Sequence, residues 1–260
     1  MDINLAVMEL GWRNPSGDDI PAFFSEVRSA DFEGVSCFTK GLIPYLDRPA
    51  EYAQLLAAED LSLASVDIET GADHDLVRRT CAFMAELGCE ALVCLGGKGT
   101  AADTYVDLAP VLDAVGSISN EFGIRTHYHN GRTRETIADM ETVYDHVDPS
   151  LVHQMCDTGH ATRDFLEVDS PADRAPTFLS KHWDQIDFIE FKDWCEETEL
   201  DTPVGEGLCG YDQIFDLFRT RGYSGWLLLE QNGNEDLQKD RTPVECAKSS
   251  REFVRSGLGV

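Results

Sequence analysis

Four short apolar segments in the second half of the sequence end in residues that could bind a metal ion. By the two-residue alternation of a strand, His127 and His129 share one face of the segment 124–129, and the segment 151–157 ends in Asp157. The segment 186–192 carries Glu190, and the apolar run of 225–231 leads to Glu230. Carboxylates that converge in an apolar setting stay desolvated and repel one another unless a cation joins them. These residues therefore predict a divalent-cation site formed by His127, Asp157, Glu190 and Glu230.

The donor set also indicates which metal ion to expect. One imidazole and three carboxylates suit Mn²⁺ or Mg²⁺, with Co²⁺ and Zn²⁺ as alternatives, better than a structural zinc site that would recruit thiolates. Each residue alone has a plainer explanation, because a strand-end carboxylate is usually solvated and a single histidine is usually a hydrogen-bonded core residue. A solvated edge does not explain four such residues at the same end of four consecutive strands, so the pattern favours the metal site.

These strand ends can meet only if the elements around them form one sheet. The chain repeats one unit, a short apolar or β-branched run followed by a turn and an amphipathic helix. Eight such units, without a glycine-rich phosphate loop after the first strand, predict an α/β fold with one closed (β/α)8 TIM barrel, a single domain over residues 1–260. In such a barrel the chemistry lies at the C-terminal ends of the strands. The predicted strands are 3–9, 34–38, 62–68, 91–96, 124–129, 151–157, 186–192 and 225–231.

The charge balance separates classes of partner. The chain has 48 acidic and 21 basic residues, a formal net charge of −27, and few of the basic residues are lysines. A field of this sign repels nucleic acid and anionic membranes, so we expect neither as a partner. Dispersed acidity with scarce lysine favours a halophilic protein, in which salt screens the self-repulsion; an ordinary acidic protein is the alternative.

The sequence shows no pattern typical of a signal peptide, a membrane span or a cysteine-pair redox site. The sequence starts with Met1-Asp2-Ile3-Asn4, which does not resemble a signal peptide, and its apolar runs fall far short of the roughly 18 residues of a membrane span. We therefore expect a soluble, cytoplasmic protein. Its eight cysteines contain no C-x-x-C pair, so we expect reduced, mostly buried thiols.

Several short motifs, taken in order along the chain, indicate a relationship to known proteins. They are Gly11-Trp12-Arg13-Asn14, Asp18-Asp19-Ile20-Pro21, the H-x-H of His127 and His129, Asp157-Thr158-Gly159-His160, Phe191-Lys192-Asp193, Gly205-Glu206-Gly207, and Gly225-Trp226 leading to Glu230. With them, nearly the whole chain resembles the xylose-isomerase-like TIM barrel family of sugar phosphate isomerases, epimerases and dehydratases. Within that family it is most similar to the inosose dehydratases.

The resemblance implies roles for particular residues. Carried over by position, it implies metal ligands at His127, Asp157, Glu190 and Glu230. Glu190 departs from the family, whose usual H-x-K-D has a histidine at this position, so the resemblance leaves open whether Glu190 binds the metal. The catalytic residues would be Glu230, His127 and His160, and the substrate-binding residues Trp12, His129, Lys192 and Glu206.

The reaction we expect is the loss of water from a 2-keto polyol through a metal-stabilised enediolate. Inversion at one carbon would need matched carboxylates on the fifth and eighth strands, and the fifth offers His127 instead. A dehydratase needs an unlike base and acid, which Glu230 and the histidines provide. A sugar isomerase or epimerase, and a barrel that binds a metal or sugar without turnover, remain alternatives. The partner is then a small polyol or ketose, and the oligomeric state stays open, a homo-oligomer included.

Overall fold

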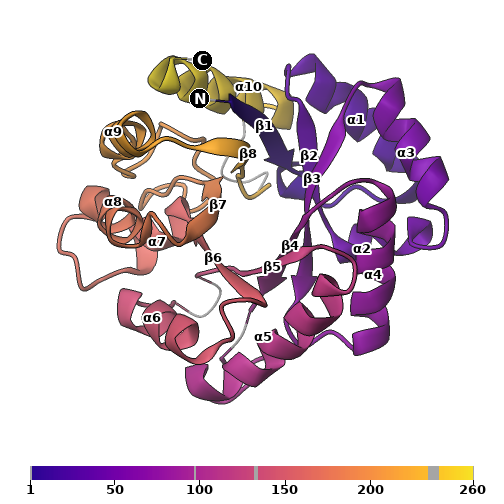
Figure 1. The fold of residues 1–260 in the computed structure, drawn as a ribbon. Coiled ribbons are helices and arrows are strands. Elements are labelled where there is room, and N and C mark those ends of the chain that lie inside the picture. Colours follow the sequence, from indigo (N-terminus) through magenta and orange to yellow (C-terminus); the bar gives the residue numbers. More distant parts are fainter. Residues whose placement is uncertain (1, 97, 132–133, 234–239, 260) are drawn as a thin grey trace.

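Eight parallel strands close into a barrel in the order β1 to β8, and β8 pairs with β1 (Figure 1). The computed structural model describes residues 2–96, 98–131, 134–233 and 240–259. The predicted (β/α)8 barrel is confirmed, and each predicted strand overlaps an observed one. The strands are β1 (Asp2–Met8), β2 (Gly34–Phe38), β3 (Ser62–Glu69), β4 (Ala91–Leu95), β5 (Arg125–Tyr128), β6 (Val152–Asp157), β7 (Ile186–Phe191) and β8 (Ser224–Leu229).

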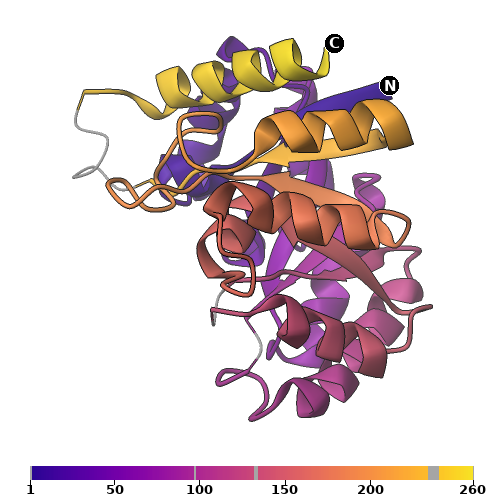
Figure 2. The same ribbon diagram turned by 90° about the vertical axis from the view of Figure 1, so that its left-hand side faces the viewer.

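Helices surround the barrel, and the last of them, α10, lies beside both chain ends (Figures 1 and 2). Thr136 and Thr242 begin α6 and α10 with reciprocal capping boxes, which satisfy backbone N–H groups that the first turn leaves unpaired. The helices are α1 (Ile20–Ser29), α2 (Thr39–Leu42), α3 (Pro49–Ala58), α4 (His74–Glu86), α5 (Tyr105–Asn120), α6 (Ile137–His146), α7 (Thr158–Asp164), α8 (Pro171–His182), α9 (Tyr211–Arg221) and α10 (Pro243–Leu258).

Two apolar layers hold the fold together. The larger layer lies between the strands and the helices, and a smaller cluster fills the barrel itself. The smaller cluster consists of Ala6, Met8, Ala64, Ala91, Val93, Met155, Phe188 and Leu228. Because these side chains plug the barrel, polar groups at its C-terminal mouth have an apolar floor beneath them.

Two irregularities change which residues face the barrel interior. Between β2 and β3 the register skips Ala64, and between β6 and β7 it skips Asp187. An extra residue in one strand reverses the inward and outward alternation beyond it. As a result Asp67 and Glu190 face inward, three residues beyond the inward Ala64 and two beyond the inward Phe188, although simple alternation from Leu63 or Ile186 would turn both outward.

The expectation of reduced cysteines is confirmed, since all eight are free thiols. Within the described ranges, no helix combines the length and apolar character needed to cross a bilayer.

Candidate metal centre

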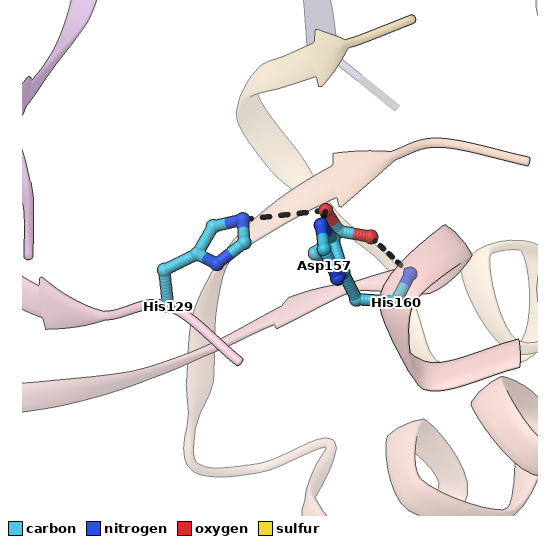
Figure 3. Close-up of side chains that lie close together, drawn as sticks. All are labelled: His129, Asp157 and His160. Carbon is cyan, nitrogen blue, oxygen red and sulfur yellow. Dashed lines mark hydrogen bonds and ion pairs between the residues drawn. The ribbon is translucent and has the colours of Figure 1, made fainter. Parts of the chain in front are cut away.

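Two histidines and an aspartate meet at the C-terminal mouth of the barrel (Figure 3). His129 follows β5, Asp157 ends β6, and His160 lies in the first turn of α7. Nε2 of His129 lies 3.2 Å from Oδ2 of Asp157, and Nε2 of His160 lies 3.8 Å from the same oxygen. One donor atom of each residue lies within 4.8 Å of the donor atoms of the other two, close enough for a single ion to bind all three.

Local structure aims Asp157 at the two imidazoles. Its Oδ1 accepts the N–H of His160 at 2.8 Å and so caps α7, which leaves Oδ2 directed at the histidine rings. Asn130 joins β5 to β6, since its Oδ1 accepts the Asp157 N–H at 2.8 Å and its Nδ2 donates to the Asp157 carbonyl at 3.0 Å. Oγ1 of Thr158 donates to the Lys192 carbonyl at 2.9 Å and accepts the Lys192 N–H at 3.0 Å, which ties α7 to the end of β7. Gly159 permits this close approach, because a Cβ there would lie 2.8 Å from Cγ of Lys192. The sequence Asp157-Thr158-Gly159-His160 is therefore a positioning motif as well as a source of donor atoms.

Two more carboxylates from neighbouring strands complete the polar side of the mouth. Oε2 of Glu190 lies 3.6 Å from Nε2 of His129, and neither Glu190 oxygen has a hydrogen-bond partner among the described residues. Burial raises the pKa of Glu190, and the charges of Glu230 and Asp157 raise it further. Burial also opposes ionisation of Glu230, but the Lys192 ammonium in direct contact with it holds the pKa of Glu230 below its ordinary value.

The charges at the mouth fit a bound divalent cation. Asp157, Glu190 and Glu230 are three carboxylates buried within reach of one buried ammonium, that of Lys192. Oδ2 of Asp157 has no hydrogen-bond partner in the described ranges, and the same holds for both oxygens of Glu190. Unpaired buried anions are costly, and an ion with two positive charges would compensate those that Lys192 leaves. His129, Asp157 and Glu190 have the oxygen and nitrogen donors that such an ion requires.

Arg163 determines which nitrogen of His160 carries the proton. Nη2 of Arg163 lies 3.0 Å from Nδ1 of His160, and a guanidinium can only donate. Nδ1 must therefore accept, which leaves the proton of the neutral ring on Nε2, facing Asp157. Burial lowers the pKa of His160, although Asp157 raises it in part, so the neutral ring is favoured. In this tautomer His160 offers a hydrogen-bond donor at the mouth rather than a lone pair, so it is not a metal ligand although the distances alone would allow it.

His127 occupies a different level of the barrel from the residues it was expected to join. Its Nε2 lies 2.7 Å from Oδ1 of Asp187, near the start of β7, and its ring packs against Phe188 and His153. Residues two apart on a strand share a face but lie almost 7 Å apart along it. The structure therefore brings His129, rather than His127, to Asp157.

The other expected substrate-binding residues are dispersed. Trp12 lines a cavity of about 420 Å³ that Glu230 also lines, and its Nε1 donates to Glu26 at 2.7 Å. Lys192 lies at the mouth, paired with Glu230. Glu206 is exposed and accepts two hydrogen bonds from Arg241, at 2.8 and 2.9 Å, so the structure does not bring it to the cluster.

Two buried aspartates have roles that the sequence patterns did not indicate. Asp193 accepts backbone N–H groups of Trp194, Gly205, Gly207 and Cys209 at 2.8 to 3.0 Å. A Cβ at Gly207 would lie 2.3 Å from Oδ1 of Asp193, so the glycines flanking Glu206 shape this loop. Asp67 faces the mouth from β3, and the skipped residue Ala64 conceals it from an alternation analysis.

Comparison with known proteins agrees with the fold and relates the chain to enzymes. Inosose dehydratase of Bacillus velezensis is 24% identical over an alignment that covers 99% of this chain and 97% of that protein. The solved structure of D-allulose 3-epimerase from Methylomonas sp. superposes with a TM-score of 0.75 at 14% identity, covering 99% of this chain and 98% of that one. A xylose isomerase-like TIM barrel protein from Mycobacterium smegmatis, solved in complex with magnesium, gives a TM-score of 0.75 at 17% identity, covering 98% and 96%.

The two structural likenesses concern the fold alone, because both identities are low. The family model described as xylose isomerase-like TIM barrel, in contrast, matches residues 24–256, almost the whole barrel. The chain belongs to the xylose isomerase-like TIM barrel family.

Proposed function

We propose that this protein is a divalent-metal-dependent lyase that removes water from a 2-keto polyol of the inosose type. Membership of the family and the similarity to an inosose dehydratase over nearly the whole chain make it a carbohydrate-modifying enzyme. The observation that supports dehydration is an unlike pair at the mouth, the carboxylate of Glu230 and the imidazole of His160. Elimination of water needs a base for the proton on carbon and a hydrogen-bond donor that stabilises the departing hydroxyl group.

Glu230 suits the part of the base. Lys192 keeps it ionised near neutral pH, so it can accept the proton next to the substrate carbonyl. Its burial at the mouth removes the water that would otherwise solvate the carboxylate. Lys192 then stays beside the newly protonated carboxyl and favours loss of that proton.

His160 suits the part of the hydrogen-bond donor to the departing hydroxyl group. Arg163 keeps Nδ1 in the accepting state, so the Nε2–H of the neutral ring points toward the mouth and can stabilise the departing oxygen. The carbon–hydrogen bond and the carbon–oxygen bond both break. Glu230 returns to the departing hydroxyl group the proton that it took from carbon, so water leaves and both protein groups end in their starting protonation states.

His129, Asp157, Glu190 and Glu230 would hold the cation in this proposal, with His129 in the place first expected for His127. A bound divalent ion supplies a Lewis acid for the carbonyl oxygen of the substrate. Mn²⁺ and Mg²⁺ are the favoured ions because most of the donors are carboxylates.

The direct test is turnover of 2-keto-myo-inositol by the metal-loaded protein. Dehydration yields a conjugated product that absorbs in the near ultraviolet, with one water lost per substrate by mass spectrometry. Recovery of a substrate that has lost no water, but has gained deuterium from heavy water and changed its stereochemistry, would replace the dehydratase with an epimerase.

A matched pair of carboxylate-to-amide variants locates the base. Glu230→Gln removes the proton acceptor and should lower kcat by at least about 100-fold, the range expected for general-base catalysis. Glu121→Gln makes the same change in the exposed pair with Arg78 and should keep kcat within about twofold. Equal losses in both variants would rule out the role given to Glu230.

A further inference from the structure

The mouth of the barrel has a second side with a different character. Whereas β5 to β8 present histidines and carboxylates, the opposite side presents Leu10, Phe38 and Leu95 around a cavity of about 270 Å³. Asp67 on β3 is the buried carboxyl in that lining. Register places it between Phe38 of β2 and Val93 of β4, so its immediate neighbours in the sheet are apolar.

Asp67 lacks the partners that a structural carboxyl normally has. Its side chain is 2% exposed, and Oδ1 has no hydrogen-bond partner in the described part of the chain. Asp193, equally buried, accepts several backbone N–H groups instead. An unpaired buried polar group destabilises the fold, so a carboxyl left in this state is explained when a ligand supplies the missing hydrogen bond.

The backbone directs this carboxyl into the cavity. The residue skipped at Ala64 reverses the alternation of β3, which turns Asp67 inward, while Val66 and Ile68 face the helices. Burial raises the pKa of Asp67, and the charges of Glu230 and Glu9 raise it further. A carboxyl in its neutral form both donates and accepts, as a hydroxyl partner requires.

We infer that Asp67 binds a hydroxyl group of the substrate at the end remote from His129, Asp157 and His160, and that it selects an uncharged polyol. Leu10, Phe38 and Leu95 pack against the C–H faces of the ring, and Asp67 is the polar contact within that apolar wall. A phosphate or carboxylate group on the substrate would lose its hydration against this apolar wall, which disfavours its binding. This inference rests on the proposed function for the identity of the reacting end, but not for the binding of a polyol.

The test compares two substitutions with different capacities. Asp67→Asn keeps a donor and an acceptor, whereas Asp67→Leu keeps only the volume. Asp184→Leu removes one negative charge from the exposed turn before β7, at the opposite end of the barrel from the mouth, and serves as the control. Thermal melts of all three variants verify that they fold.

Binding of myo-inositol, an unreactive neutral polyol, is measured by calorimetry with the full chain. We expect Asp67→Leu to raise Kd by about 10-fold or more, in line with the loss of a buried hydrogen bond, and Asp67→Asn and Asp184→Leu to stay within about threefold of the wild type. We also expect the wild type to bind myo-inositol more tightly than its phosphate monoester. Equal affinity in wild type and Asp67→Leu, no polyol binding by the wild type, or preference for the phosphate would each overturn the inference.

Turnover separates this inference from the proposed function. If 2-keto-myo-inositol reacts, the analogue lacking the hydroxyl opposite the ketone should lose about 10-fold or more in kcat/KM with the wild type and far less with Asp67→Leu. Undiminished discrimination by Asp67→Leu would overturn the role of Asp67 while the dehydratase stands. If no turnover occurs but the binding differences are found, the dehydratase fails and the role of Asp67 stands.

Discussion

Glu9 lies just beyond β1 with its carboxyl fully buried, and replacing it with Gln should stabilise the protein in a pH-dependent manner. Oε1 accepts the Phe38 N–H at 2.9 Å, while Oε2 has no hydrogen-bond partner among the described residues. Burial raises the pKa of Glu9 to about 7, and the Phe38 hydrogen bond lowers it only in part. Glutamine keeps an acceptor for that N–H and removes the charge.

The magnitude follows from linkage between ionisation and folding. A raised carboxyl pKa means that the stability present below the unfolded pKa of 4.5 is lost as the pH rises through about 7. At about 1.4 kcal/mol per pKa unit, ionisation destabilises the folded state by about 3 kcal/mol at pH 8 and by less than about 1 kcal/mol at pH 5. The advantage of Glu9→Gln should therefore grow by about 2 to 3 kcal/mol between these two pH values.

Urea unfolding at pH 5 and pH 8, in the same salt concentration, measures this difference. Glu86→Gln is the matched control, because it removes an identical charge from an exposed position on α4 and should show no such growth. If the free-energy difference between Glu9→Gln and wild type were the same at both pH values, Glu9 would not be the buried acid described above.

Three further expectations concern the metal, the base and salt. Asp157→Asn should lower the metal content measured by mass spectrometry at least about 10-fold while His127→Gln changes it less than about twofold, and comparable losses would return His127 to the site. Lys192→Met should raise the pKa of Glu230 and so move the acidic limb of the kcat/KM profile to higher pH, whereas an unmoved limb would assign that limb to another group. The melting temperature should rise steeply from low to molar KCl because of the net charge of −27, and a flat dependence would contradict the halophilic interpretation.

Periodicity predicted the barrel because each strand is buried on both faces. This burial requires the short apolar runs that are visible in the sequence. The same reasoning assigned His127 and His129 to one face but could not give their depth, since depth depends on where neighbouring strands end. Asp67 escaped the pattern because one skipped residue in β3 changes the face without changing the composition. The pairing of Glu206 with Arg241 joins residues 35 apart in sequence, which no local signal reveals.

The hydrogen bonds of Asp193 have a consequence for motion near the mouth. One carboxylate joins the amides of Trp194, Gly205, Gly207 and Cys209, so both ends of the loop after β7 share a single anchor. A small movement of either end of that loop would stretch hydrogen bonds to the same carboxylate, that of Asp193. Displacement of the loop is therefore cooperative, because it must break all of these bonds together or carry the loop as one rigid flap.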